Sequence, residues 1–292
     1  MTITRQQVQG ANVAKKAAPM VLSITSGKGG VGKTLTTVNT AVSLKRMGYS
    51  VLILDGDFGL SNVDVVLGLQ AKKNIRDVLD GHASLKDIIV EGPMGLKVIP
   101  SGSGVASLTQ LSHAQRQSLL SQVENFDEPF DVLLIDTGAG IGENVLHFNA
   151  QSDQVVVVTT PEPHALTDAY ALIKVMSENY SQKTFNLLVN QTRSGEEGLK
   201  IFERIAEVAN RFLNIEVAYL GHVPLDPQVP KSVMQRRAAS EQSTFTLAGQ
   251  AWNQMARSLV EKCGLNARNQ NVQEFWRNLL WTEVNSETHT GL

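Results

Sequence analysis

A glycine-rich loop with two lysines is the stretch of this sequence that points most directly to chemistry. From Gly27 onward it fits the pattern G-x-x-x-x-G-K-[ST]. Glycines let backbone N–H groups point at phosphate oxygens, and a following helix start adds partial positive charge. Lys33 is expected to reach the β- and γ-phosphates, and the Thr34 hydroxyl to bind Mg²⁺. The predicted phosphate-binding residues are Gly27, Lys28, Gly29, Gly30, Val31, Gly32, Lys33 and Thr34.

Two acidic segments follow apolar runs and supply the carboxylates that phosphate chemistry needs. Asp55 and Asp57 come after the run 51–54, and Asp136 comes after the run 132–135. One carboxylate of the first pair can hold Mg²⁺ through a water, and the other can orient or activate the attacking water. Asp136 stands where a Walker B aspartate ends its strand. The alternative interpretation of both segments is an ordinary turn at the end of a strand.

The elements that carry these residues follow a regular pattern, in which apolar runs alternate with helix-length segments. Continuous β-branched runs between amphipathic segments are typical of a buried parallel sheet. Functional residues in such sheets lie just beyond the carboxyl ends of the strands. Asn190 and Pro224 also occupy such positions. We therefore expect an α/β fold, with a mostly parallel sheet flanked by helices on both faces and strands near 21–25, 51–54, 132–135, 155–158, 185–189 and 217–223.

The sequence predicts one domain with an extension at each end. Residues 1–20 are polar and basic, without the apolar core of a secretory signal, and we expect them to be flexible. The domain is expected over 21–264, followed by a linker, a short helix and a tail within 265–292.

A glycine-rich turn without ligand is the alternative for the phosphate loop, but a strand before it and a helix after it favour nucleotide binding.

Composition limits the other possibilities. Of 292 residues 42% are hydrophobic, so a sizeable core can form, and the net charge of −2 gives no global sign of nucleic-acid binding. A single cysteine, Cys263, excludes a disulfide scaffold or a cysteine-built metal site within one chain. No apolar run is long enough to span a bilayer. We expect a cytoplasmic protein.

The C-terminal segment has a pronounced apolar periodicity. An apolar residue recurs at positions i, i+3, i+4, i+7 and i+8, which predicts an amphipathic helix over about 272–281. Such a helix, rich in aromatic residues and tethered by a polar linker, suits an anchor at an anionic membrane surface. A helix packed permanently on its own domain is the alternative, and a switch between the two is a third. The predicted membrane-binding residues are Val272, Phe275, Trp276, Leu279 and Leu280.

The loop K-G-G-x-G-K-T resembles the deviant Walker A motif of the MinD/ParA family of P-loop ATPases. The segments 55–64 and 136–140 are similar to the family's D-x-D-x-G-L-x-N-x-D and D-x-x-A-G switches. The resemblance implies that Lys28 crosses a dimer interface to the partner's ATP, so that nucleotide state controls dimerisation. It implies that Asp57 is the hydrolytic aspartate and that Lys28 and Lys33 are the other catalytic residues. It also implies that Thr34, Asp55 and Asp136 bind the Mg²⁺ ion. Asn190 and Pro224 would contact the adenine.

Within the family, the chain is similar to the flagellar-number branch, the FlhG (FleN) type. The segments 57–69, 136–142 and above all 167–174 carry this resemblance. It implies a slow, Mg²⁺-dependent ATPase that regulates flagellar number, placement and gene expression. Implied partners are the GTPase FlhF, a flagellar transcription activator or basal-body proteins, with reversible association with the inner membrane face. Leu35, Gly138 and the N-terminal segment 5–9 depart from common patterns of the family.

Other functions remain open from the sequence. One is a DNA-partitioning ATPase of the ParA type, which would bind DNA without sequence specificity as an ATP dimer, and another is a MinD-type regulator of the division site. A third is an interaction protein whose hydrolysis is incidental. The near-neutral charge and the aromatic tail favour a membrane over DNA, so no direct specific nucleic-acid binding is expected.

Overall fold

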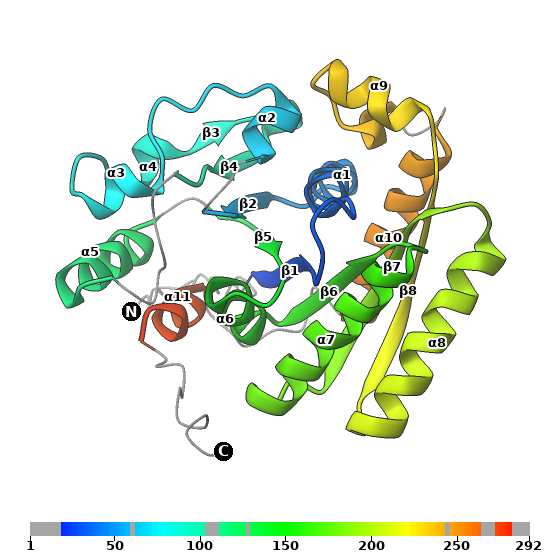
Figure 1. The fold of residues 1–292 in the computed structure, drawn as a ribbon. Coiled ribbons are helices and arrows are strands. Elements are labelled where there is room, and N and C mark those ends of the chain that lie inside the picture. The colour runs from blue at the N-terminus through cyan, green and yellow to red at the C-terminus, as the bar shows by residue number, and fades with distance from the viewer. Residues whose placement is uncertain are drawn as a thin grey trace, which may run out of the picture.

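The computed structural model describes residues 19–58, 62–102, 111–126, 129–242, 246–263 and 272–281. Its centre is an eight-stranded sheet in the order β3-β4-β2-β5-β1-β6-β7-β8 (Figure 1). Every neighbouring pair is parallel except β3 and β4. The strands are β1 (Met20–Ser26), β2 (Val51–Gly56), β3 (Val90–Glu91), β4 (Lys97–Ile99), β5 (Val132–Ala139), β6 (Gln154–Thr159), β7 (Thr184–Thr192) and β8 (Glu216–Pro224).

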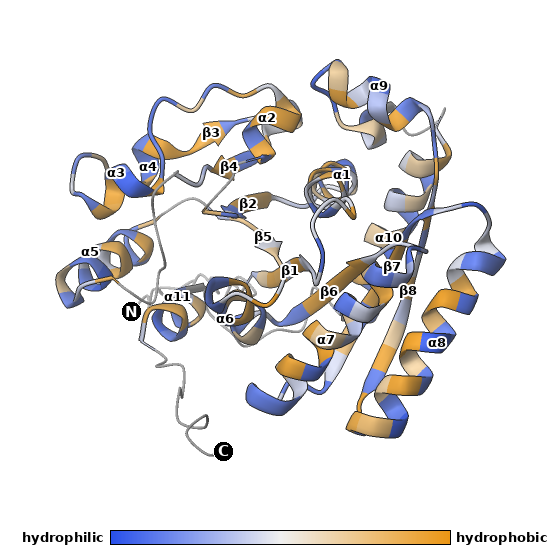
Figure 2. Cartoon of the chain, viewed as in Figure 1, coloured by the Kyte–Doolittle hydropathy of each residue, from blue (hydrophilic) through white to orange (hydrophobic). Residues whose placement is uncertain are grey.

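Helices cover both faces of the sheet, and the strand register explains why. Leu22 and Ile24 of β1 point into the core beneath α1 and α10, whereas Val21 faces the opposite core, beneath α5, α6 and α11. Strand β6, near the middle of the sheet, is accordingly hydrophobic over most of its length (Figure 2). The α-helices are α1 (Lys33–Arg46), α2 (Val63–Leu67), α3 (Ile75–Leu79), α4 (Leu85–Ile88), α5 (His113–Glu124), α6 (Glu143–Gln151), α7 (Pro163–Asn179), α8 (Gly195–Leu213), α9 (Gln228–Met234), α10 (Leu247–Cys263) and α11 (Val272–Trp281).

Local sequence signals set several helix starts. Asn74, Ser84 and Ser112 each accept a hydrogen bond from the first turn of their helix, and a side chain of that turn bonds back to the backbone N–H of the cap. These capping boxes satisfy N–H groups that the helix itself leaves without partners. The described residues also include the 3₁₀ helices η1 (Pro93–Gly95) and η3 (Ala239–Gln242).

The structure confirms the predicted fold class and adjusts some bounds. Each expected strand is present, but β5 continues past Asp136 to Ala139, and Asn190 lies inside β7 rather than after it. The switch segment 137–139 therefore starts as strand, paired with Ser26 of β1, and not as a loop. In the part of the chain that the structure describes, no helix is both long and apolar enough to cross a membrane. The predicted extension over 1–20 lies almost entirely outside the described residues, and so do 264–271 and 282–292.

Candidate functional site

The glycine loop connects β1 to α1, as predicted, and its backbone turns where two glycines allow it. Gly30 and Gly32 have φ values of 81° and 93°, a conformation that residues with a Cβ rarely adopt. Gly32 is the N-cap of α1, and no acidic residue lies in the first turn of that helix. The helix start therefore offers its N–H groups and partial positive charge to an anion.

Gly27 is fixed by a close approach and not by its dihedral angles. A Cβ at this position would lie well under 3.0 Å from the backbone carbonyl of Asp168 in α7. A Cβ at Gly29 would have Ala139 as its nearest neighbour at 3.9 Å, which is ordinary contact. The loop is thus closely packed on α7 at Gly27, whereas a side chain would have room at Gly29.

We expect Gly27→Ala to lower the free energy of unfolding by about 1–3 kcal/mol, because the loop or α7 must move to admit the methyl group. Gly29→Ala, two residues away in the same loop, is the matched control and should change it by less than about 1 kcal/mol. Urea unfolding without nucleotide measures both. Equal losses in the two variants would contradict the close packing of Gly27 on α7.

Lys33 lies at the first position of α1 with 8% of its surface exposed. Burial lowers the pKa of its ammonium group, and the charges of Asp136 and Asp57 act in the opposite direction. A buried cation with two carboxylates nearby has its charge partly balanced before any ligand binds. Its position at the helix start, one residue before Thr34, is the one that the phosphate-loop pattern requires.

Asp55 near the end of β2 and Asp136 within β5 lie side by side, because the strand register pairs them directly. Both are almost fully buried. Burial, followed by the charge of Asp55, raises the pKa of Asp136 to about 7. Hydrogen bonds from Thr34 and Thr37 act against this rise, the second at 2.9 Å. The phosphate-loop threonine and the Walker B aspartate are therefore in contact.

This arrangement fits Mg²⁺. Two adjoining buried carboxylates of like charge, with the Thr34 hydroxyl beside them, are hard oxygen donors whose repulsion a divalent cation would relieve. Among the described residues, no group of three His, Cys, Asp or Glu side chains could hold a metal alone. In nucleotide sites Mg²⁺ is usually bound by one or two carboxylates together with waters and phosphate oxygens, and this donor set is compatible with that mode.

Asp55 also organises the segment that follows it. Its carboxylate accepts hydrogen bonds from the backbone N–H groups of Asp57 and Asn62, both at 3.1 Å, and of Val63 at 3.3 Å. The Asp57 carbonyl accepts the Ser101 hydroxyl at 3.0 Å. A Cβ built on Gly138 would be 3.7 Å from the Asp57 carboxylate. Asp57 thus faces both Lys33 and the second switch segment.

Lys28 does not point into the site of its own chain. Its ammonium group is 2.5 Å from the Glu162 carboxylate at the start of α7, and both side chains are partly exposed. The hydrogen bond and charge of Lys28 lower the pKa of Glu162. The structure therefore separates the two lysines of the loop. Lys33 is buried among the aspartates, and Lys28 lies at the surface.

The two residues expected near a base line a cavity beside the phosphate loop. Asn190 donates a hydrogen bond to the Val31 carbonyl at 2.8 Å, and its side-chain oxygen accepts the Gln191 N–H at 2.9 Å. Asn190 therefore braces the loop as well as lining the cavity. The volume is about 370 Å³, and the lining is mainly apolar, from Leu35, Asn190, Gln191, Val223, Pro224, Leu225, Asp226, Val229, Pro230, Val233 and Trp252.

Helix α11 is present at the predicted position and is docked on α5 and α6 (Figure 1). Phe275, Trp276, Leu279 and Leu280 are each 3% exposed or less, in a core shared with Phe148 of α6. Arg277 on the other side pairs with Glu124 of α5 at 3.3 Å. The structure thus shows the packed arrangement that was one alternative for this helix. It does not bear on membrane binding, and the side chain of Val272 is outside the described set.

Sequence reasoning missed three participants. Glu162 follows the apolar run of β6 and a proline, which marks the end of a strand but not the partner of Lys28. Thr37 is one turn after Lys33 on α1, so its approach to Asp136 follows from helical spacing. The third is His147 of α6, whose contact with α11 no local sequence pattern indicates. It is buried, its pKa is lowered by burial, and a ring nitrogen hydrogen-bonds the Leu279 carbonyl of α11.

A phosphate loop between a strand and a helix, with buried aspartates at neighbouring strand ends, defines a P-loop NTPase. The family model ParA, described as NUBPL iron-transfer P-loop NTPase, matches residues 18–260. The chain belongs to this ParA/MinD family.

Similar proteins include antiactivator FleN of Pseudomonas aeruginosa, 38% identical over 82% of this chain and 85% of the relative. Flagellum site-determining protein YlxH of Helicobacter pylori is also 38% identical, over 89% of each chain. The structure of the septum site-determining protein MinD of Pyrococcus horikoshii with Mg-ADP has a TM-score of 0.68 and 25% identity. It covers 86% of this chain and 100% of its own.

Proposed function

We propose that this protein is an ATP-dependent switch that dimerises when it binds ATP and regulates the number and placement of flagella. The similarity to an antiactivator and to a flagellum site-determining protein supports the flagellar role. The observation that carries the switch is the second lysine of the loop. The Lys28 ammonium group pairs with Glu162 at the surface, whereas Lys33 is buried near Asp57 and Asp136.

In the proposed reaction, the loop N–H groups and Lys33 hold the β- and γ-phosphates and neutralise charge that develops during transfer. Asp57 accepts a hydrogen bond from the attacking water and orients it toward the γ-phosphorus. Thr34, Asp55 and Asp136 would hold Mg²⁺, which supplies charge neutralisation between the phosphates when bound. The cavity beside Asn190 and Pro224 takes the adenine. Hydrolysis yields ADP and phosphate.

Lys28 would act in the partner's site. Its side chain leaves Glu162 and reaches the phosphates bound by the second subunit, so that each ATP is enclosed by two chains. Both residues of the pair are partly exposed, so the pair is weak and easily exchanged for a stronger contact with phosphate. ADP lacks the γ-phosphate to which Lys28 would bind, so the dimer would separate after hydrolysis.

We further propose that ATP releases α11 to an anionic membrane surface. Helix α6 follows the second switch directly, and its Phe148 ring lies 5.9 Å from Phe58 of the first switch. The neighbouring His147 bonds the Leu279 carbonyl of α11. A shift of either switch on ATP binding would therefore act on the helix that holds α11. The proposed location is the cytoplasm, with reversible binding to the inner membrane face, and proposed partners are FlhF, a flagellar transcription activator or basal-body proteins.

Lys28→Ala should abolish the ATP-dependent dimer, while the ATP affinity of the monomer changes by less than about threefold, because the Lys28 side chain is directed to Glu162 in its own chain. Light scattering coupled to size exclusion, with ATP and hydrolysis blocked, measures the mass. Lys33→Ala is the contrasting variant and should lose ATP binding itself. An unaltered dimer in Lys28→Ala would refute the cross-subunit role.

A further inference from the structure

The cavity assigned to the base has one wall that belongs to neither the sheet nor the phosphate loop. Val229, Pro230 and Val233 of α9 form it, opposite Leu35 of α1 and Trp252 of α10. Helix α9 has only seven residues, and Val229 and Val233 are partly exposed. So short a helix has little rigidity of its own, because most helical stability comes from packing against other elements. Hydrogen bonds at its two ends therefore add to the packing of Val229 on the core in fixing its position.

The N-terminal end of this wall is fixed by a buried carboxylate. Asp226 accepts the Gln228 N–H at 2.8 Å at the start of α9 and the Ala248 N–H at 3.1 Å in α10. At the other end α9 leads into η3, and the Arg237 N–H donates to the Ser232 carbonyl at 3.0 Å. We call the segment from Asp226 through α9 to η3 the strap. The contacts that hold η3 in place form its second anchor.

That second anchor is α1, the helix that begins at the phosphate loop. Asn39 of α1 is 1% exposed and accepts the Ser240 N–H at 2.7 Å and the Ser240 hydroxyl at 2.9 Å. Its amide nitrogen donates to the Leu35 carbonyl at 2.7 Å. One side chain thus joins the strap to the very residue of α1 that lines the cavity.

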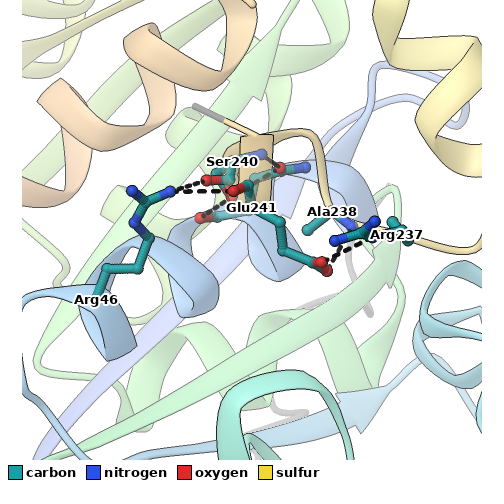
Figure 3. Close-up of polar contacts among 6 residues, drawn as sticks. Arg46, Arg237, Ala238, Ser240 and Glu241 are labelled. Carbon is teal, nitrogen blue, oxygen red and sulfur yellow. Dashed lines mark hydrogen bonds and ion pairs between the residues drawn. The ribbon is translucent and has the colours of Figure 1, made fainter. Parts of the chain in front are cut away.

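Arg46, two turns further along α1, completes the anchor (Figure 3). Its guanidinium donates to the carbonyls of Ser240 at 2.8 Å and Glu241 at 3.2 Å. The Glu241 carboxylate in turn accepts the Ala238 N–H at 3.1 Å and pairs with Arg237 at 3.0 Å. The Glu241 carboxylate thus bonds to the residues just before η3, while the Arg46 guanidinium bonds to two carbonyls of η3. Hydrogen bonds in which one partner is charged are stronger than those between neutral groups.

We propose that Asn39 and Arg46 are positioning residues for the nucleotide base. They tie the α9 wall to α1, so that the helix which presents Lys33 to the phosphates also sets the width of the base cavity. The inference rests on the proposed function, since it takes the cavity beside Asn190 as the base site. Neither residue contacts the nucleotide, and both act through η3 and α9.

The test compares ATP with inorganic tripolyphosphate, both as Mg²⁺ complexes, by titration calorimetry on the full chain. Arg46→Ala and Asn39→Ala should weaken ATP binding about three- to tenfold, because each removes hydrogen bonds that hold the wall. Tripolyphosphate lacks a base, so its affinity should change by less than about twofold. Lys45→Ala, the adjacent cation on α1, is the matched control and should change neither.

Because Arg46 is exposed, we expect Arg46→Ala to retain the fold, and thermal unfolding of each variant checks this. Equal weakening of both ligands would overturn the proposal, since it would mean that α1 itself had been damaged. Unchanged ATP affinity in both variants would overturn it as well. If wild-type protein binds tripolyphosphate as tightly as ATP, the cavity is not a base site, and the proposal fails together with that assignment.

Discussion

Asp57→Ala is expected to slow ATP hydrolysis by about 10²–10⁴-fold, the usual contribution of a group that positions or activates water. ATP binding should persist, because the loop N–H groups, Lys33 and Thr34 hold the phosphates without it. The dimer should therefore form with ATP and stay assembled. Single-turnover release of labelled phosphate gives the rate, and size exclusion in ATP gives the assembly state.

Asp64→Ala is the matched control for this variant. It removes a carboxylate from the same switch region, where Asp64 hydrogen-bonds the Val65 N–H at 2.8 Å at the start of α2. Asp57, in contrast, is one of the two carboxylates whose charge raises the pKa of Lys33 against the effect of burial. Hydrolysis in Asp64→Ala should stay within about tenfold of the wild-type rate. A wild-type rate in Asp57→Ala would show that another group positions the water.

The fold class and the centre of the site were predictable because their signals are local. The spacing from Gly27 to Thr34 fixes which backbone and side-chain groups can surround a phosphate. Asp55 and Asp136 each end an apolar run, and parallel strands bring such ends to one edge of the sheet. That these two strands are neighbours and that Asp55 pairs with Asp136 in register is shown by the structure alone.

The contacts between distant segments were not predictable. Nothing near Lys28 indicates that its partner is Glu162, which depends on how β6 lies beside β1. The extension of β5 to Ala139 depends on its pairing with Ser26, and a glycine-containing segment reads locally as a loop. The periodicity of α11 predicts an apolar face but not what covers it, since a groove of α5 and α6 and a lipid surface select the same side chains.

The second large effect concerns α11 and membranes. Its four buried apolar residues would each gain about 1.5–3 kcal/mol from leaving water, as an upper range, whether they enter the groove or a bilayer. The proposed switch requires ATP binding to shift the balance from the docked helix to the membrane-bound helix. Two anchors in an ATP dimer would raise apparent membrane affinity by up to about 10²–10⁴-fold. Vesicle binding should accordingly require ATP.

Charged substitutions on the apolar face of α11 need a control, because this face is buried against the domain. Trp276→Glu with Leu280→Glu should abolish vesicle binding, but both positions are buried in the domain, so the double variant should also lose thermal stability without lipid. Arg277→Ala changes the exposed face of the same helix and should retain vesicle binding. Loss of vesicle binding in Arg277→Ala equal to that in the double variant would contradict the role of the apolar face.

Tryptophan quenching by anionic vesicles with brominated acyl chains tests the release of α11 most directly. Trp276 and Trp281 belong to this helix, whereas Trp252 is buried in the domain. Quenching reports entry into the hydrocarbon, which a spectral shift would not, because Trp276 already lies in an apolar environment. The account predicts quenching of Asp57→Ala protein with ATP, none with ADP, and none with unbrominated vesicles. Unquenched fluorescence with ATP, or equal quenching with both nucleotides, would contradict it.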